Sequence, residues 1–170
     1  MTIEPVLASS HARQQPTAAE QRELAQRHRV VAEARRWIGT PYHEGADLLG
    51  VGVDCGMLIV RVFVDLGFVA PFDPRPYARD WMMHNDEEKY LAWMKSFCAE
   101  VAEPAPGDIA IFRYGRVYSH GGIVSNAAPR ALIHAYADAH CVVEEGFAQN
   151  AHLTLPIRKP RYFSIWAKIP

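Results

Sequence analysis

The sequence predicts an α+β fold, in which helices occupy the first part of the chain and an antiparallel sheet occupies the second. Before residue 104, apolar residues recur at helical spacing, and the run from Met57 to Leu66 is apolar enough to form a buried helix. From Pro104 onward, short runs rich in valine, isoleucine, phenylalanine and tyrosine alternate with turn residues, as is typical of strands. This order favours a curled sheet with the Met57–Leu66 helix packed on it.

Length and composition fit one well-cored unit. The chain has 170 residues, 49% hydrophobic and 22% charged, which is short for two domains. Residues 1–16 mix small, polar and proline residues without periodicity, so we expect a flexible N-terminal arm before a single domain of residues 17–170. The net charge of -1 provides no strong positive field, which argues against nucleic acid or an anionic membrane as partner.

The three cysteines are an odd number in a chain too large to need disulfide staples. At least one thiol is therefore expected to stay free. Residues 1–20 lack the apolar core of a signal peptide, and no apolar run reaches the roughly 20 residues that span a bilayer. We expect a product made in the cytoplasm, for which any export needs another route.

The first helix is predicted to begin at a capping box formed by Thr17 and Glu20. It should end before Gly39, with its many arginines on a solvated face. The residues that recur at helical spacing along it are Leu24, His28, Val31 and Ile38.

The second helix carries the first cysteine. Asp54 is a plausible N-cap, and Gly67 closes the apolar run. A thiol at Cys55 would face unpaired backbone amides and the positive end of the helix dipole, both of which favour thiolate. The alternative is that Cys55 is a small buried hydrophobe, as most cysteines are.

Further along, Pro71, Pro74 and Pro76 predict an extended crossing. Asn85 is then expected to cap a third helix, in which Cys98 is a core residue. The buried stripe of this helix is predicted to contain Leu91, Met94, Phe97, Cys98 and Val101.

The second half of the chain is predicted to be a meander of about five strands. The expected strands cover Asp108 to Arg113, Val117 to Ser125, Ala131 to Ala137, Cys141 to Glu145 and Tyr162 to Ile169. The turns between them are expected at residues 114–116, 126–130 and 138–140.

Two histidines on neighbouring predicted strands can meet a thiol on a helix packed against the sheet. His120 is followed by two glycines that leave space beside the imidazole, and His134 lies on the next strand. With Cys55, they supply a thiol, a base and an orienting group. Each histidine could instead be ordinary satisfied structure. A zinc site is disfavoured because the cysteines are far apart in sequence.

In order along the chain, the sequence resembles the NlpC family of papain-like cell-wall cysteine peptidases. The resemblance covers about Ala32 to Pro170. Its motifs are Gly39-Thr40-Pro41-Tyr42, Asp54-Cys55, Pro106-Gly107-Asp108-Ile109-Ala110-Ile111-Phe112, Ser119-His120-Gly121-Gly122-Ile123-Val124 and Ile133-His134-Ala135. The segment Pro76-Tyr77-Ala78-Arg79-Asp80-Trp81, with His84 beyond it, is further similar to the branch encoded with phage and prophage tail genes.

The resemblance implies a papain-like fold of the NlpC type and a role for each matching residue. Cys55 matches the nucleophile, His120 the general base and His134 the residue that orients the base. Tyr42 matches a tyrosine beside the thiol, and its hydroxyl together with the Cys55 amide would stabilise the oxyanion.

Two further positions concern the substrate. Asp54 matches an acid that recognises the amino end of the stem peptide in relatives. Gly56 departs from the family, which commonly has serine there, so this chain lacks a hydroxyl near the substrate and its fine specificity should differ.

The function implied is hydrolysis of an amide in the peptide stem of peptidoglycan, between D-glutamate and the diamino acid, with no metal or cofactor. The alternatives are an N-acetylmuramoyl-L-alanine amidase or an acyltransferase using the same triad, or a structural tail component that retains the fold. The expected partners are the stem peptide and phage tail proteins. Delivery by a virion tail or by lysis would bring the enzyme to the periplasm or cell wall.

Overall fold

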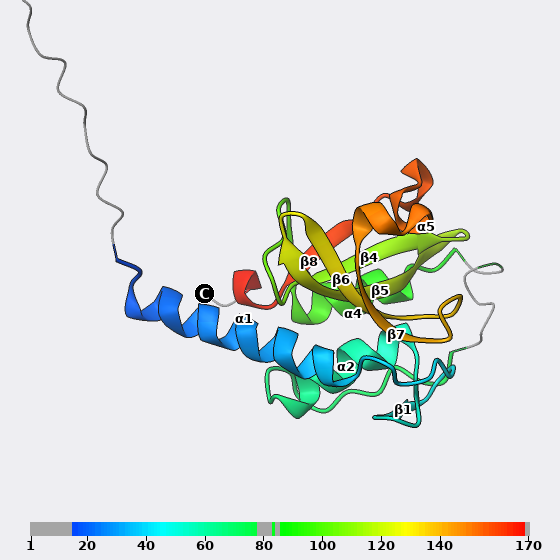
Figure 1. Cartoon of the computed structure of the whole chain (residues 1–170), viewed down its shortest axis with the longest axis horizontal. Helices are drawn as coiled ribbons and strands as arrows, with labels where there is room; N and C mark the ends of the chain where they lie inside the picture. Colours follow the sequence, from blue (N-terminus) through cyan, green and yellow to red (C-terminus); the bar gives the residue numbers. More distant parts are fainter. Residues whose placement is uncertain (1–14, 78–82, 84–85, 169–170) are drawn as a thin grey trace, which may run out of the picture.

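The computed structural model describes residues 15–77, 83 and 86–168 (Figure 1). Three helices pack near a six-stranded sheet, and the predicted α+β class is confirmed. The helices are α1 (Ala18–Arg36), α2 (Cys55–Asp65) and α4 (Lys89–Phe97). None of the helices in the described part of the chain is long and apolar enough to cross a bilayer.

All neighbouring strands of the large sheet are antiparallel, in the order β3-β8-β4-β5-β6-β7. Its strands are β3 (Ala99–Val101), β4 (Ile109–Tyr114), β5 (Val117–Ala127), β6 (Arg130–Tyr136), β7 (Cys141–Gly146) and β8 (Arg161–Ser164). The predicted meander is confirmed for β4 to β7, whereas β3 and a two-stranded sheet of β1 (Asp47–Leu48) and β2 (Gly52–Val53) were not predicted.

The two faces of the large sheet bury separate apolar clusters. Ile109 and Ile111 of β4 point into the main core, which they share with α1, α2 and α4. Ala110 and Phe112 alternate with them and pack on the opposite face, against Leu153 of the short helix α5 (Ala151–Thr154). The main core therefore fixes where the start of α2 meets β5.

Helix α1 begins as predicted, because Thr17 and Glu20 form the capping box. Of the residues predicted at helical spacing, Val31 is buried, whereas Leu24 and Ile38 are 52% and 45% exposed. The other buried residues of the helix are Val30 and Ala34. All buried residues of α1 lie in its C-terminal half, because only this half packs on the core.

One arginine of α1 does not lie on a solvated face. Arg27 donates to Asp108 at 2.8 Å and to the carbonyl of Pro106 at 3.1 Å, and its guanidinium lies 4.1 Å from the ring centre of Trp166. Asp108 is 2% exposed, so this ion pair joins α1 to the loop before β4 and to the C-terminal segment.

Helix α2 begins at Cys55, directly after the predicted N-cap. Asp54 caps it, accepting from the amide of Met57 at 2.8 Å. Gly67 follows the helix with φ of +73°, a conformation that glycine adopts without a Cβ penalty. The first turn of the helix, and therefore the thiol, has a fixed position relative to the core.

Between α2 and the sheet, two predictions need correction. Helix α4 ends at Phe97, so Val101 belongs to β3 and not to a helical stripe, while Cys98 is 4% exposed and lies in the core as expected. The cap predicted at Asn85 lies outside the described residues, and α4 begins after Glu88. Residues 71–77 form neither helix nor strand, in agreement with the prediction that their prolines exclude a helix.

The end of the chain forms less strand than predicted. In place of a strand from Tyr162 to Ile169, β8 ends at Ser164 and a 3₁₀ turn, η3 (Trp166–Lys168), follows. Two more short 3₁₀ helices flank α5, namely η1 (Phe147–Gln149) and η2 (Pro156–Arg158). Ile169 lies outside the described residues.

Candidate active site

Cys55 is the first residue of α2 and lies against β5. Its sulfur is 3.7 Å from the carbonyl oxygen of Ser119. The backbone amide of Gly121 also interacts with the thiol. The sulfur thus contacts the backbone on either side of His120. The main core sets this position of the sulfur, because it packs α2 on β5.

The state of the thiol differs from the sequence-based expectation. Burial and, second, the negative charge of Asp54 raise the pKa of Cys55 to about 12, whereas the backbone amides of Gly121 and Gly56 pull the pKa down. The amides at the helix start are therefore present, but they do not outweigh desolvation. Burial therefore favours the neutral thiol over the thiolate at this position.

Two imidazoles and a carboxylate form a continuous chain of hydrogen bonds across β5, β6 and β7. Nε2 of His120 lies 2.8 Å from Nδ1 of His134, and Nε2 of His134 lies 2.8 Å from Oε1 of Glu145. Asn150 donates to the same carboxylate oxygen at 2.6 Å. Because Nε2 of His120 is occupied, its Nδ1 is the ring nitrogen left for proton exchange with a thiol.

Burial favours the neutral form of both imidazoles. It lowers the pKa of His120 well below the ordinary value, and the neighbouring His134 and Arg158 lower it further. Burial also lowers the pKa of His134, although its contact with Glu145 acts in the opposite direction. A thiol and an imidazole that both favour the neutral form are the partners that general-base activation of a nucleophile requires.

The two glycines after His120 make room for different neighbours. A β-carbon at Gly122 would come within 2.7 Å of Cβ of His134, and one at Gly121 would come within 2.7 Å of the hydroxyl of Tyr90. Gly122 therefore lets His134 approach His120. Gly121 admits Tyr90 from α4 on the other side of the strand.

Asp54 is buried at 3% exposure, with three donors around its carboxylate. Besides the amide of Met57, it accepts from the amide of Gly45 at 2.7 Å and from the hydroxyl of Tyr77 at 2.6 Å. Any ammonium group that binds this carboxylate has to compete with the Tyr77 hydroxyl for Oδ2.

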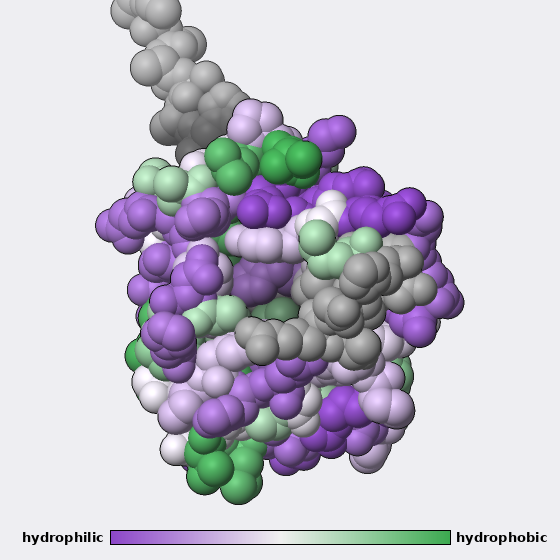
Figure 2. Space-filling view, turned by 90° about the vertical axis from the view of Figure 1, so that its right-hand side faces the viewer, coloured by the Kyte–Doolittle hydropathy of each residue, from purple (hydrophilic) through white to green (hydrophobic). Residues whose placement is uncertain are grey.

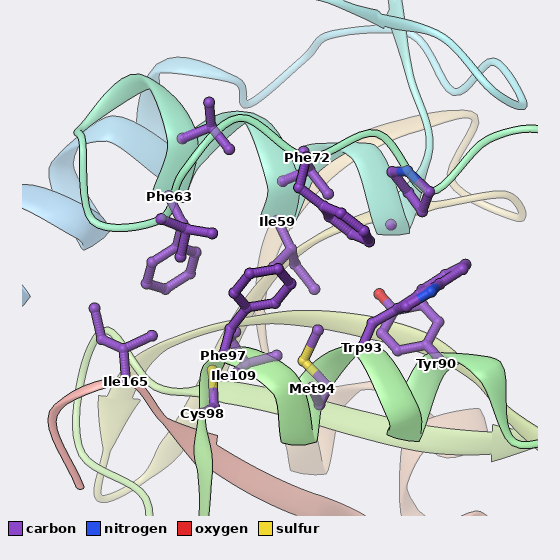
Figure 3. Close-up of a pocket in the computed structure, with 15 residues that line it drawn as sticks. Ile59, Phe63, Phe72, Tyr90, Trp93, Met94, Phe97, Cys98, Ile109 and Ile165 are labelled. Carbon is purple, nitrogen blue, oxygen red and sulfur yellow. The ribbon is translucent and has the colours of Figure 1, made fainter. Parts of the chain in front are cut away.

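The right-hand side of Figure 1, where α2 begins beneath the sheet, is turned to the viewer in Figure 2 and is hollowed near its centre. Apart from this surface hollow, an apolar cavity of about 520 Å³, its open mouth included, lies between α2 and α4 (Figure 3). Gly56 is one of the residues that line this cavity. Tyr90 enters this cavity from α4, and its hydroxyl has no hydrogen-bond partner in the described part of the chain.

No protein-family model matches the chain, and no curated protein matches it. Solved structures do. The NlpC/p60 domain of the peptidoglycan hydrolase SagA is 20% identical, with a TM-score of 0.55 over 81% of this chain and 97% of that one. NlpC1 from Trichomonas vaginalis is 16% identical, with a TM-score of 0.57 over 81% of this chain and 43% of that one. An N-acetylmuramoyl-L-alanine amidase from Bacteroides uniformis is 12% identical, with a TM-score of 0.52 over 82% and 98%.

The chain has the NlpC/p60 fold. This agrees with the papain-like architecture that the sequence motifs implied. Of the predicted site residues, His120 and His134 are in direct contact, Cys55 contacts the backbone of Ser119 next to His120, and Gly56 lies near the carboxylate of Asp54. The side chain of Tyr42 is half-buried and packs on the main core, and its amide donates to the carbonyl of His140 at 2.8 Å.

Sequence reasoning missed four residues of this NlpC/p60 site: Tyr77, Tyr90, Glu145 and Asn150. For Glu145, the signal was available, because a carboxylate on the strand after His134 could reach its ring. Tyr77 lies in the segment Pro76 to Trp81, to which sequence reasoning assigned no role at the thiol. Tyr90 and Asn150 lie outside the motifs, so only the folded structure identifies them. Among residues 15–77, 83 and 86–168, no group of three or more His, Cys, Asp or Glu side chains is placed to hold a metal ion.

Proposed function

We propose that this protein is a cysteine hydrolase that cleaves an amide bond in the peptide stem of bacterial peptidoglycan. The observation that carries this proposal is the contact of the Cys55 thiol with the backbone of Ser119 and Gly121, on either side of His120, whose ring lies 2.8 Å from His134. The fold is shared with proteins described as a peptidoglycan hydrolase and an N-acetylmuramoyl-L-alanine amidase, which supports this class of substrate.

The reaction proposed is acyl transfer through a thioester. Nδ1 of His120 takes the proton of the Cys55 thiol as the sulfur attacks the carbonyl carbon. The C–N bond then breaks, and the imidazolium returns the proton to the leaving amine. Water, deprotonated by the same imidazole, hydrolyses the thioester and regenerates the thiol. The Cys55 amide and the Tyr42 hydroxyl are proposed as donors to the oxyanion.

Mass spectrometry of purified peptidoglycan after incubation with the protein tests this proposal. We expect new soluble fragments with the wild-type protein and none with Cys55→Ala. If the folded wild-type protein releases nothing from walls of several chemotypes and Cys55 does not react with a thiol probe, the protein is a structural component that retains the fold.

The bond proposed is the one between D-glutamate and the diamino acid. Support comes from Asp54, a carboxylate next to the nucleophile that could receive the free amino end of a short stem peptide. Gly56 removes one polar contact, worth about 1 kcal/mol, that a serine would offer. The preference for a free amino end should therefore be weaker than with serine.

Amidase action at the lactyl–alanine bond is the second candidate, because one similar structure is an N-acetylmuramoyl-L-alanine amidase. The fragment masses separate the two, since an amidase releases the whole stem peptide and an endopeptidase releases a shortened one. Acyltransferase chemistry would instead yield a new amide with an added amine acceptor.

We further propose that the enzyme works on the cell wall after delivery with phage or prophage tail proteins or by lysis. The support is the sequence similarity of Pro76 to Trp81, of which residues 78–81 lie outside the described residues. Association with tail proteins in a pull-down from an induced lysogen would test this proposal.

A further inference from the structure

The contact between His134 and Glu145 determines where the protons of the catalytic chain lie. A carboxylate only accepts hydrogen bonds, so Nε2 of His134, at 2.8 Å from Glu145, has to carry a hydrogen. A neutral His134 then has a lone pair on Nδ1, which accepts from Nε2–H of His120 at 2.8 Å. The lone pair of His120 is left on Nδ1.

Asn150 fixes the direction of this chain at its far end. The oxygen of its amide is engaged by the backbone N–H groups of His152 and Leu153, at 2.9 Å and 3.2 Å. Its amino group therefore points at Glu145 and donates at 2.6 Å. The Glu145 oxygen thus accepts from both Asn150 and His134, which leaves the imidazole no choice of tautomer.

We propose that Glu145 is a positioning residue that selects the Nε2–H tautomers of His134 and His120 and so leaves Nδ1 of His120 free to act as the base. Its part in turnover rests on the proposed function, whereas its effect on the two imidazoles does not. The site is then a four-membered chain of thiol, base, orienting histidine and carboxylate.

The surroundings of His134 supply no competing group of this kind among the described residues. His134 is fully buried, and the ring of Tyr136 stacks on it at 5.2 Å between centroids with an interplanar angle of 19°. Tyr114 and Arg158 lie on the side of His120. Only the Glu145 carboxylate reaches Nε2 of His134.

Glu145→Gln combined with Asn150→Asp tests the proposal, because the two changes keep both side-chain sizes and reverse the hydrogen bond between them. The new carboxylate at position 150 accepts from the glutamine amide, which then also donates to Nε2 of His134, reverses both tautomers and places a hydrogen on Nδ1 of His120. We expect the alkylation rate of Cys55 and the hydrolysis rate to fall roughly 100-fold. Glu145→Gln alone should be less impaired, because the amino group of Asn150 keeps the glutamine oxygen turned toward Nε2 of His134.

The readouts separate tautomer selection from packing. Long-range ¹H–¹⁵N spectra of the histidine rings should show hydrogen on Nε2 of both imidazoles in the wild type and in Glu145→Gln alone, and on Nδ1 in the double variant. Packing alone would leave the double variant, whose side chains match the wild type in size, as reactive as Glu145→Gln alone. The matched control is Glu144→Gln, on the same strand, where Glu144 pairs with Arg35 at the surface at 2.8 Å.

The double variant with wild-type tautomers and wild-type Cys55 alkylation would overturn the proposal, whatever the activity on peptidoglycan. Reversed tautomers and slow alkylation in this variant, together with a wild-type protein inert toward peptidoglycan, would uphold it and reject the proposed function instead.

Discussion

Gly122 and His134 lie so close that a β-carbon on the glycine would come within 2.7 Å of Cβ of the histidine. The same carbon would lie 2.7 Å from the carbonyl oxygen of Ile133, which is backbone and cannot rotate away. The packing of β5 against β6 therefore requires a residue without a side chain at position 122. The space left by Gly122 lets the imidazole of His134 reach His120.

Gly122→Ala should both destabilise the protein and impair the site. Overpacking of this kind typically costs about 1–3 kcal/mol of unfolding free energy, because the strand or the histidine has to move. Urea unfolding at constant m-value would measure the cost. Gly56→Ser is the matched control, since a β-carbon there meets nothing closer than 3.6 Å. An Ala variant as stable as the Ser variant would contradict this view of β5.

The reactivity of the three thiols provides a test of Cys55 that needs no substrate. Cys98 is 4% exposed and should label slowly, while Cys141 is half-buried at the start of β7 and serves as an internal reference. Because the pKa of Cys55 is raised to about 12, its labelling at neutral pH depends on proton removal by His120. We expect Cys55 to label before both.

His120→Ala should then slow the labelling of Cys55 and leave that of Cys141 unchanged. Mass spectrometry of iodoacetamide-treated protein, digested at several times, gives the three rates separately. Equal rates for Cys55 in the wild type and in His120→Ala would count against the pairing of thiol and base.

The shifted pKa values predict that stability falls on both sides of neutral pH. Burial lowers the pKa of His120 and His134 below 6.5, so the unfolded chain binds protons at these groups while the native protein does not. The free energy of unfolding should therefore decrease as the pH falls below 6.5. The raised pKa of Cys55 acts on the alkaline side. Above pH 9 the unfolded chain loses a proton that the native protein keeps, so the free energy of unfolding should decrease as the pH rises.

Urea unfolding at pH 5 to 10 would show both limbs. Cys55→Ala should reduce the slope of the limb between pH 9 and 10, to which tyrosines with a raised pKa such as Tyr77 and Tyr90 also contribute. His120→Gln should flatten the acid limb. If neither variant changes the slope relative to the wild type, other groups cause the pH dependence.

The sequence was sufficient for the parts of the site that depend on local signals. Asp54 and Gly67 mark the two ends of α2, and an apolar run between them indicates burial, so the position of Cys55 followed from a few adjacent residues. The histidines followed from their positions on successive strands. The fold class needed only the change from helical to strand patterns at Pro104.

The features of the site that depend on strand register and burial could not be predicted from local sequence signals. His134 is paired in register with Val143, and Glu145 reaches the imidazole diagonally from two residues further along β7. That register depends on the turn at residues 137–140, which strand alternation does not specify. The pKa of Cys55 was predicted in the wrong direction because the helix start is visible in sequence and desolvation is not.

The hydrogen bond from Tyr77 to Asp54, 2.6 Å long, leads to a prediction on substrate selection. Tyr77→Phe removes one of the three donors around the Asp54 carboxylate and leaves the amides of Gly45 and Met57 in place. A buried carboxylate that lacks a donor gains more from an incoming ammonium group. We expect the preference for a free over an N-acetylated stem peptide, measured as the ratio of kcat/KM values, to increase about tenfold.

Asp54→Asn is the control for this measurement. It keeps an oxygen to cap α2 through the amide of Met57 but loses the negative charge, so the preference for a free amino end should largely disappear. Both variants should retain the far-ultraviolet circular dichroism of the wild type. If acetylation changes kcat/KM equally in all three proteins, Asp54 serves only as the helix cap, and the bond proposed between D-glutamate and the diamino acid loses its main support.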